Sequence, residues 1–266
     1  MKSKTSFDGN KSFFSEITHA DERVLIVDYE GILAPLSLAD GRTAPDPALW
    51  ELLKDVMQYR TRVITVSRWP ACNVASWFGI HQIPEIWGND GLERLLANGQ
   101  YTCWELHTPI ELLRAIAECE LRLEEVGLTN RMNTQLSGVT INWRGLTASQ
   151  KLNTRVKAYG VLQPLTVAYP ALRLVPFDEG FELRLPVPSK ADIIQRLLDA
   201  TPSNIPIAYM GHSTTDEETF RIMNGRGLTV LVRPVARFTA AQVCLSPSDD
   251  LPSFLTNWIA ASINDL

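Results

Sequence analysis

An apolar stretch that ends in two acidic residues constrains the fold of this chain more than any other feature. Residues 23–27 have the sequence RVLIV and are followed directly by Asp28, Tyr29, Glu30 and Gly31. Such a run predicts a strand buried on both faces, as in the middle of a parallel sheet. Ligands of open α/β sheets bind at the carboxyl ends of strands, so the stretch indicates a functional strand tip. The alternative, a central strand that ends in an ordinary polar loop, stays open on this stretch alone.

The composition is that of a globular protein. The 266 residues are 45% hydrophobic and 21% charged, which suits one large domain or a core with a second module. A net charge of −5 gives no support for nucleic-acid binding. The four cysteines lack metal-site spacing and predict reduced thiols in a cytoplasmic protein. No apolar run is long enough to span a bilayer, and Met1–Asn10 lacks the apolar segment of a secretory signal, so no membrane association is expected.

Apolar strands alternate with helices on both sides of a central block that has a different pattern. This alternation predicts a parallel sheet with helices on its faces. An N-terminal extension, residues 1–22, is expected to be loose, with a short helix near Phe13 and Phe14. The expected strands beyond the first are 62–68, 83–91, 205–210, 228–232 and 243–245, and the expected helices start at 47, 71, 190, about 217 and 251.

Residues 108–185 differ from the rest, because they combine short alternating strands with two helices. The first helix is expected to open at Thr108, with Glu111 completing a capping box, and to end near residue 126. The second is expected from a capping box at 147–150 to about residue 159. Strands are predicted at 138–144, 172–175 and 181–185. We predict an inserted cap domain over 108–185 and a core domain made of 23–107 and 186–266.

Four separated motifs occur in one order along the chain. They are Asp28-Tyr-Glu-Gly31, Val66-Ser67, Lys190 and the segment 211–218, which has the sequence GHSTTDEE. This order resembles the haloacid dehalogenase (HAD) superfamily, with its D-x-D-G-T-L, Ser or Thr, Lys and G-D-D motifs. Finer features are similar to the trehalose-6-phosphate phosphatase family: Trp87-Gly-x-x-Gly-Leu-Glu93, Phe181-Glu-Leu-Arg184 and Gly211-x-x-Thr-Thr-Asp-Glu-x-x-Phe220. The resemblance implies an α/β fold, a HAD-like Rossmannoid three-layer core with a parallel sheet and an inserted α+β cap of the C2 type.

The resemblance also implies a chemistry, the hydrolysis of a sugar-phosphate monoester through an aspartyl-phosphate, in trehalose biosynthesis. Asp28 would be the nucleophile, and Glu30 the general acid and base where the family has Asp. The glutamate arm is one methylene longer, which changes the geometry at the reacting atoms. Ser67 and Lys190 would hold the phosphate, and Arg144 would contact the substrate from the cap. The alternative for Lys190 is a solvated residue at a helix start, where a cation is mildly unfavourable.

A Mg²⁺ site is implied as well, formed by Asp28, the backbone carbonyl of Glu30 and the acids of the G-D-D motif. Here His212 and Ser213 replace two of those acids, while Asp216 matches a later one. Mg²⁺ prefers oxygen ligands, so weak Mg²⁺ binding is expected, with Mn²⁺ or Zn²⁺ as ions that tolerate imidazole. Two alternatives stay open: a helix cap over residues 215–218 instead of metal support by Asp216, and His212 as a polar strand-tip residue instead of a ligand.

The cap departs from the family pattern too. The family's H-Y-R strand and its sugar-contacting E-x-K pair correspond here to Asn142-Trp143-Arg144 and Asn133-Thr134-Gln135. Neutral amides bind sugar hydroxyls less strongly than charged groups, so a substrate other than trehalose-6-phosphate stays open. Trp143 is either a sugar-stacking residue or a core residue. The alternative function is a catalytically impaired HAD-fold protein that binds a phosphosugar or regulates a partner such as a trehalose-pathway synthase. The oligomeric state is left open.

Overall fold

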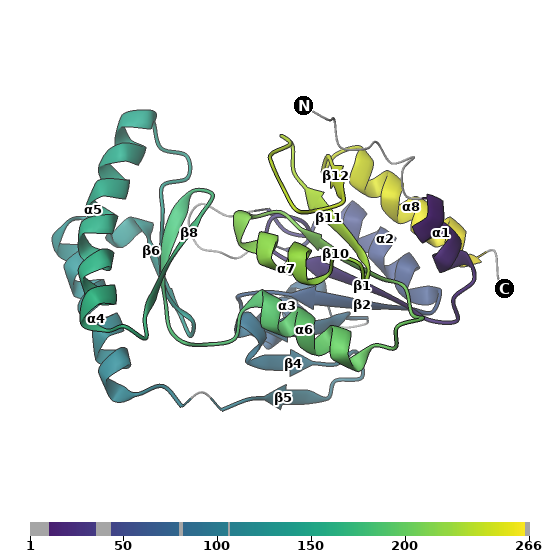
Figure 1. Ribbon diagram of the computed structural model, residues 1–266, viewed down its shortest axis with the longest axis horizontal. Helices are drawn as coiled ribbons and strands as arrows, with labels where there is room; N and C mark the ends of the chain where they lie inside the picture. The colour runs from purple at the N-terminus through teal and green to yellow at the C-terminus, as the bar shows by residue number, and fades with distance from the viewer. Residues whose placement is uncertain (1–10, 36–43, 80–81, 106, 264–266) are drawn as a thin grey trace. The chain divides into compact units, whose positions relative to one another are not determined.

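The computed structural model describes residues 11–35, 44–79, 82–105 and 107–263 (Figure 1). The described residues form two compact units, and each is presented by itself. The first comprises the residues up to Cys103 and those from Ser189 onward, and the second is Trp104–Pro188. Residues 1–10 of the predicted N-terminal extension lie outside the described residues. No helix in the described part of the chain has the length and apolar character needed to cross a membrane.

A mixed sheet of eight strands forms the centre of the first unit, with β1 (Arg23–Asp28) between β10 and β2. Every residue of β1 is buried, as its apolar sequence predicts. The six strands from β12 to β3 run parallel to one another, and β4 pairs antiparallel with both β3 and β5. The other bounds are β2 Thr61–Val66, β3 Glu85–Gly88, β4 Glu93–Leu95, β5 Tyr101–Cys103, β10 Ile207–Gly211, β11 Leu228–Val232 and β12 Val243–Leu245.

Helices cover both faces of this sheet and make the predicted three-layer core. Leu25 and Val27 point into one buried cluster, which contains residues of α1, α2, α3 and α8. Val24 and Ile26 point into a second cluster with residues of α6 and α7, which lie in front of the sheet in the view of Figure 1. The bounds are α1 Lys11–Thr18, α2 Pro47–Gln58, α3 Ala71–Phe78, α6 Lys190–Ala200, α7 Glu217–Ile222 and α8 Asp250–Ile263.

The register of the parallel strands decides which residues meet at the carboxyl edge of the sheet. Asp28 pairs with Val66 of β2, and Val27 pairs with Met210 of β10. The residues that follow these strands, Ser67 and His212, therefore lie on either side of the tip of β1. Topology alone brings the predicted motifs of three distant segments together.

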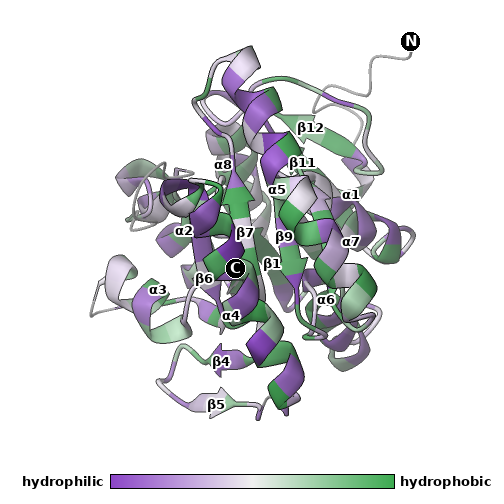
Figure 2. Ribbon diagram, turned by 90° about the vertical axis from the view of Figure 1, so that its left-hand side faces the viewer, coloured by the Kyte–Doolittle hydropathy of each residue, from purple (hydrophilic) through white to green (hydrophobic). Residues whose placement is uncertain are grey.

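The second unit is a four-stranded antiparallel sheet in the order β6-β7-β9-β8, covered on one face by two helices. Apolar colour marks β7 and β9 in Figure 2, and their residues Val139, Ile141, Phe181 and Leu183 form the core with the helices. The bounds are β6 Met132–Gln135, β7 Gly138–Asn142, β8 Arg173–Phe177, β9 Gly180–Arg184, α4 Ile110–Glu125 and α5 Ala148–Ala168.

Two local predictions for the second unit are wrong. The expected capping box of Thr108 and Glu111 is absent, because α4 starts after Pro109 and no side chain caps it. The helix predicted to end near residue 159 continues to Ala168 through Pro164. Buried side chains of its last turns, such as Leu162 and Leu165, offset the backbone hydrogen bond that the proline removes. The strand β6 was not predicted, since its four residues are polar apart from the first.

Candidate functional site

Predicted site residues converge at the carboxyl edge of the first unit's sheet. Asp28 ends β1, Ser67 follows β2, Lys190 opens α6, and Asp216 lies in the short helical turn η4 (Thr214–Asp216) after β10. The side chains of Asp28, Ser67 and Asp216 are fully buried. Buried polar groups of this kind require partners within the protein, so their hydrogen bonds define the site.

The carboxylate of Asp28 is held through one of its two oxygens. Oδ2 accepts a hydrogen bond from Lys190 Nζ at 2.6 Å and lies 2.9 Å from His212 Nδ1. A carboxylate only accepts, so Nδ1 faces it as a protonated nitrogen; this hydrogen is assigned from the contact. Asp28 Oδ1 is buried and has no hydrogen-bond partner among the described residues. One oxygen of Asp28 is therefore fixed while the other keeps its lone pairs.

Lys190 is an interior cation, and the alternative of a solvated residue is wrong. Its side chain is 13% exposed and contacts Asp216 Oδ1 at 3.2 Å as well as Asp28. Burial acts to lower the pKa of Lys190, but the charges of Asp216 and Asp28 outweigh it and raise the pKa above its ordinary value. Ser189 fixes the start of the helix by a capping box with Asp192. The ammonium is thus held charged beside two carboxylates.

Asp216 accepts hydrogen bonds on both oxygens. Oδ1 accepts from Tyr209 Oη at 2.7 Å and from Lys190, and Oδ2 accepts from the backbone N–H groups of His212 at 2.9 Å and Ser213 at 2.8 Å. Burial acts to raise the pKa of Asp216, but Lys190, His212 and these hydrogen bonds lower it to about 2. The capping alternative is therefore supported, since Asp216 caps a turn and also holds the site lysine, whereas metal support by Asp216 stays a prediction.

The cap at this turn lies two residues earlier than the sequence pattern predicts. Ser213 and Asp216 form the capping box, and Ser213 Oγ accepts from the Thr215 N–H at 3.2 Å. The prediction over residues 215–218 is wrong because the chain already enters the turn at Thr214. Tyr209 was not predicted as a site residue, although a tyrosine in a fully buried strand signals a buried hydroxyl that needs a partner.

Glu30 and Ser67, which the sequence assigns to different tasks, contact each other. Ser67 Oγ donates to Glu30 Oε1 at 2.6 Å, and the Arg68 N–H reaches the same oxygen at 3.2 Å. Ser67 Oγ also accepts from the Trp69 N–H, so its single hydrogen is committed to Glu30. Within the described part of the chain, Glu30 Oε2 has no hydrogen-bond partner. A phosphate role for Ser67 stays a prediction that requires Glu30 to release this hydroxyl.

Burial, followed by the nearby charge of Asp28, raises the pKa of Glu30. An acid with a raised folded-state pKa contributes stability below its unfolded pKa, and this contribution is lost as pH rises through the folded-state value. Glu30→Gln keeps an oxygen for Ser67 and removes the charge. We expect its melting temperature to exceed that of the wild type at pH 7, with a smaller difference near pH 4. Thermal unfolding at both pH values measures this, and an equal difference at both would contradict a raised pKa.

Gly31 makes room for the imidazole of His212. Its φ is +80°, a conformation that favours glycine. A Cβ at this position would lie 2.5 Å from Cδ2 and 2.6 Å from Nε2 of His212. The glycine of the first motif therefore serves both the turn out of β1 and the placement of a side chain that follows β10.

Arg144 belongs to the second unit, where its Nε lies 3.5 Å from Glu179. The neighbouring Trp143 is 9% exposed and packs edge-on against Phe181, with ring centroids 5.1 Å apart. This contact favours the core alternative for Trp143. The substrate role of Arg144 stays a prediction.

Asp28, His212 and Asp216 have the spacing of a cation site, with one ligand atom of each within 4.8 Å of the others. The hydrogen bonds do not suit Mg²⁺, however. Both oxygens of Asp216 are occupied, and Oδ2 of Asp28 faces Lys190 and His212, which leaves Oδ1 of Asp28 as the free oxygen of the cluster. Mg²⁺ requires hard oxygen ligands in octahedral geometry. As arranged, these side chains do not fit it.

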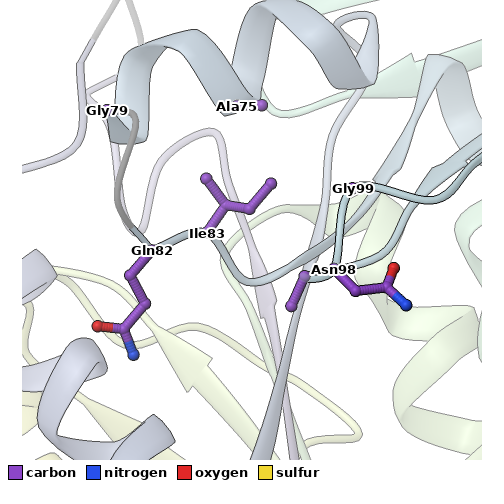
Figure 3. Close-up of a pocket in the computed structure, with 7 residues that line it drawn as sticks. Ala75, Gly79, Gln82, Ile83, Asn98 and Gly99 are labelled. Carbon is purple, nitrogen blue, oxygen red and sulfur yellow. The ribbon is translucent and has the colours of Figure 1, made fainter.

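A motif residue without an assigned task, Glu93, is structural. Its Oε2 accepts from the Ala71 N–H at the start of α3 at 2.7 Å, and its Oε1 accepts from Asn89 Nδ2 at 2.5 Å. A hollow lined by described residues lies elsewhere in the first unit (Figure 3). It measures about 330 Å³ and is lined by Ala75, Gly79, Gln82, Ile83, Ala97, Asn98 and Gly99. These residues flank the amino end of β3, at the opposite edge of the sheet from Asp28, and none is charged.

The fold and the order of its strand-tip residues define a class of protein fold. A parallel sheet whose central strand ends in Asp28, a helix that presents Lys190 to it and an inserted α+β unit are the features of the HAD fold, and the predicted fold class is confirmed.

Solved structures with a similar fold include trehalose-6-phosphate phosphatases and related HAD-fold proteins. The C-terminal domain of Candida albicans trehalose-6-phosphate phosphatase matches with a TM-score of 0.75 and 14% identity over 94% of this chain and 95% of that chain. The C-terminal domain of the Candida albicans trehalose synthase regulatory protein matches with a TM-score of 0.64 and 13% identity over 93% and 97%. A phosphatase of the HAD enzyme superfamily from Bacteroides thetaiotaomicron has a TM-score of 0.58 and 13% identity over 89% and 95%.

No protein-family model and no curated protein sequence matches the chain. At identities of 13–14%, the three structures establish the fold that the motifs predicted, and the activity has to be argued from the site.

Proposed function

We propose that the chain is a phosphatase that hydrolyses a sugar-phosphate monoester through an aspartyl-phosphate on Asp28. The observation that carries this proposal is the asymmetric environment of the Asp28 carboxylate. Lys190 holds Oδ2 at 2.6 Å, whereas the buried Oδ1 has no hydrogen-bond partner among the described residues, which supports its role as the attacking oxygen. Two residues on, Glu30 combines a raised pKa with a partner-free Oε2, as a general acid requires.

The first half of the reaction forms the intermediate. Asp28 Oδ1 attacks phosphorus, the bond from phosphorus to the sugar oxygen breaks, and the leaving oxygen takes the proton of Glu30. In the second half, water attacks phosphorus and gives a proton to Glu30. The bond from phosphorus to Asp28 then breaks, which releases inorganic phosphate and restores the carboxylate. Lys190 offsets part of the like-charge repulsion between Asp28 and the substrate, which is about 4 kcal/mol per charge pair at 4 Å and an effective dielectric constant of about 20.

The finer parts of the proposal come from the resemblance. Residues 108–185 would act as the cap of a core made of 23–107 and 186–266, with Arg144 contacting the sugar. Neighbours with the same fold include trehalose-6-phosphate phosphatases, which supports a phosphosugar substrate and a place in trehalose biosynthesis. A cytoplasmic location agrees with four cysteines that form no disulfide.

A second candidate function is favoured by one observation, the replacement of two motif acids by His212 and Ser213. A centre that binds a phosphosugar but turns it over poorly would suit a regulatory protein. The structural neighbour from a trehalose synthase regulatory protein supports this candidate, with a trehalose-pathway synthase as the partner.

The deciding experiment is phosphate release from a panel of sugar phosphates that includes trehalose-6-phosphate. We expect turnover of at least one substrate. The phosphatase activity should elute from gel filtration together with the folded protein. If a protein that melts cooperatively releases no phosphate from any substrate of the panel, the phosphatase function is rejected. The phosphosugar-binding function then remains.

A further inference from the structure

We infer that His212 takes the place of a divalent cation beside Asp28, so that the centre binds phosphate monoesters without a metal ion. The inference rests on the proposed function for the identity of Asp28 as the nucleophile. It goes beyond that function because it assigns a chemical role to His212 and removes a cofactor.

The contacts of Asp28 supply the first argument. A cation beside a nucleophilic carboxylate would bind one oxygen, hold the group in place and offset its charge. Lys190 and His212 together do this at Oδ2, at 2.6 Å and 2.9 Å, and they leave Oδ1 free. The 2.9 Å contact assigns the hydrogen to the His212 nitrogen that faces Asp28, and a nitrogen that donates in this contact offers no lone pair to a metal.

The imidazole of His212 is also held in this position by its surroundings. The His212 side chain is 14% exposed, and Gly31 leaves the space that its ring occupies. The His212 N–H is bonded to Asp216 at 2.9 Å, and its carbonyl accepts from Arg233 Nη1 at 3.3 Å. Anchored at backbone and ring alike, His212 is a positioning residue for Asp28 and not an incidental strand-tip side chain.

The acids that a metal would need supply the third argument. Asp216 accepts four hydrogen bonds, from Tyr209, Lys190 and two backbone N–H groups. Recruiting it as a ligand would break the capping box of η4 and separate it from Lys190. Restoring a metal site therefore requires a new acid, and position 212 is the place where one would face Asp28.

The first experiment is calorimetric titration of EDTA-treated, dialysed protein with Mg²⁺, Mn²⁺ and Zn²⁺. We expect no site-specific binding of any of the three to the wild type. His212→Asp supplies the missing oxygen ligand, and we expect it to bind one Mg²⁺ ion at concentrations at least tenfold below those at which the wild type shows none bound. Stoichiometric binding of any of these ions to the wild type, lost in Asp28→Asn, would overturn the inference.

The second experiment measures binding of inorganic phosphate in EDTA. We expect the wild type to bind, and His212→Ala to bind about 10- to 100-fold more weakly, the loss expected for one hydrogen bond to a charged group. His107→Ala is the matched control, because His107 is an exposed histidine of the second unit. Equal affinity of wild type and His212→Ala would overturn the inference, and this comparison holds even where His212→Asp does not fold.

Failure of the inference and failure of the proposed function give different results. Phosphate release that stops in EDTA and returns with Mg²⁺ would keep the phosphatase and reject the role of His212. Phosphate binding in EDTA that depends on His212, without turnover of any sugar phosphate, would keep the role of His212 and reject the phosphatase.

Discussion

Asp28→Asn is expected to reduce phosphate release by about 10⁴-fold or more, the loss seen when a covalent nucleophile is removed. The amide has the size of the carboxylate, and its oxygen can take the place of Oδ2 toward Lys190. Its nitrogen then occupies the position of Oδ1, where it has no lone pair that can attack phosphorus. The measurement is the turnover number on the best substrate of the panel, together with acid-quench trapping of the phosphorylated protein.

Asp199→Asn is a matched control, because Asp199 is an exposed carboxylate near the end of α6 whose partner is Gln195. It should retain wild-type turnover and the covalent phosphate. Both variants should remain folded by circular dichroism. Turnover by Asp28→Asn within tenfold of the wild type would exclude an aspartyl-phosphate on this residue and leave the observed pairing with Lys190 as an interior ion pair only.

The parts of the structure that depend on local pattern could be predicted from the sequence. The strand before Asp28 is apolar throughout, and burial on both faces follows from that. The helix expected to start at residue 47 does so: Asp46 caps α2 by accepting from the N–H groups of Ala48 and Leu49, and Pro47 lies in the first turn. The alternation of strands and helices predicts the parallel sheet but not its strand order, and the meeting of Asp28 with Lys190 was expected from the family resemblance.

The pairing of side chains within the site could not be predicted in the same way. Ser67 follows β2 and Glu30 follows β1, and only the register of the two strands decides that hydroxyl and carboxylate meet. Gly31 and His212 lie far apart in the sequence, so nothing local indicates that one leaves space for the ring of the other. The sequence around Asp216 likewise predicts a helix cap but does not indicate its contact with Lys190, which is distant in the sequence.

Asp216→Asn is expected to lower the free energy of unfolding by about 3 to 5 kcal/mol, the cost of removing one partner from a buried ion pair. An asparagine places an NH₂ group against donors on one side, either the two backbone N–H groups or Tyr209 and Lys190. Lys190 then keeps one carboxylate in place of two. Urea unfolding at pH 7 measures the difference.

The pH dependence separates this charge effect from a packing defect. The pKa of Asp216 is lowered to about 2 in the folded protein, from an ordinary value of 3.8. Its ionisation therefore stabilises the fold above pH 3.8, and the contribution is lost as pH falls toward 2. We expect the difference in free energy of unfolding between wild type and Asp216→Asn to narrow over that range, whereas Tyr209→Phe, which removes one neutral donor, should cost about 1 kcal/mol. If the free energy of unfolding of Asp216→Asn stays below that of the wild type by a constant amount down to pH 2, the fold depends on the shape of this side chain and not on its charge. The charge of Asp28 alone would then hold Lys190 in the site.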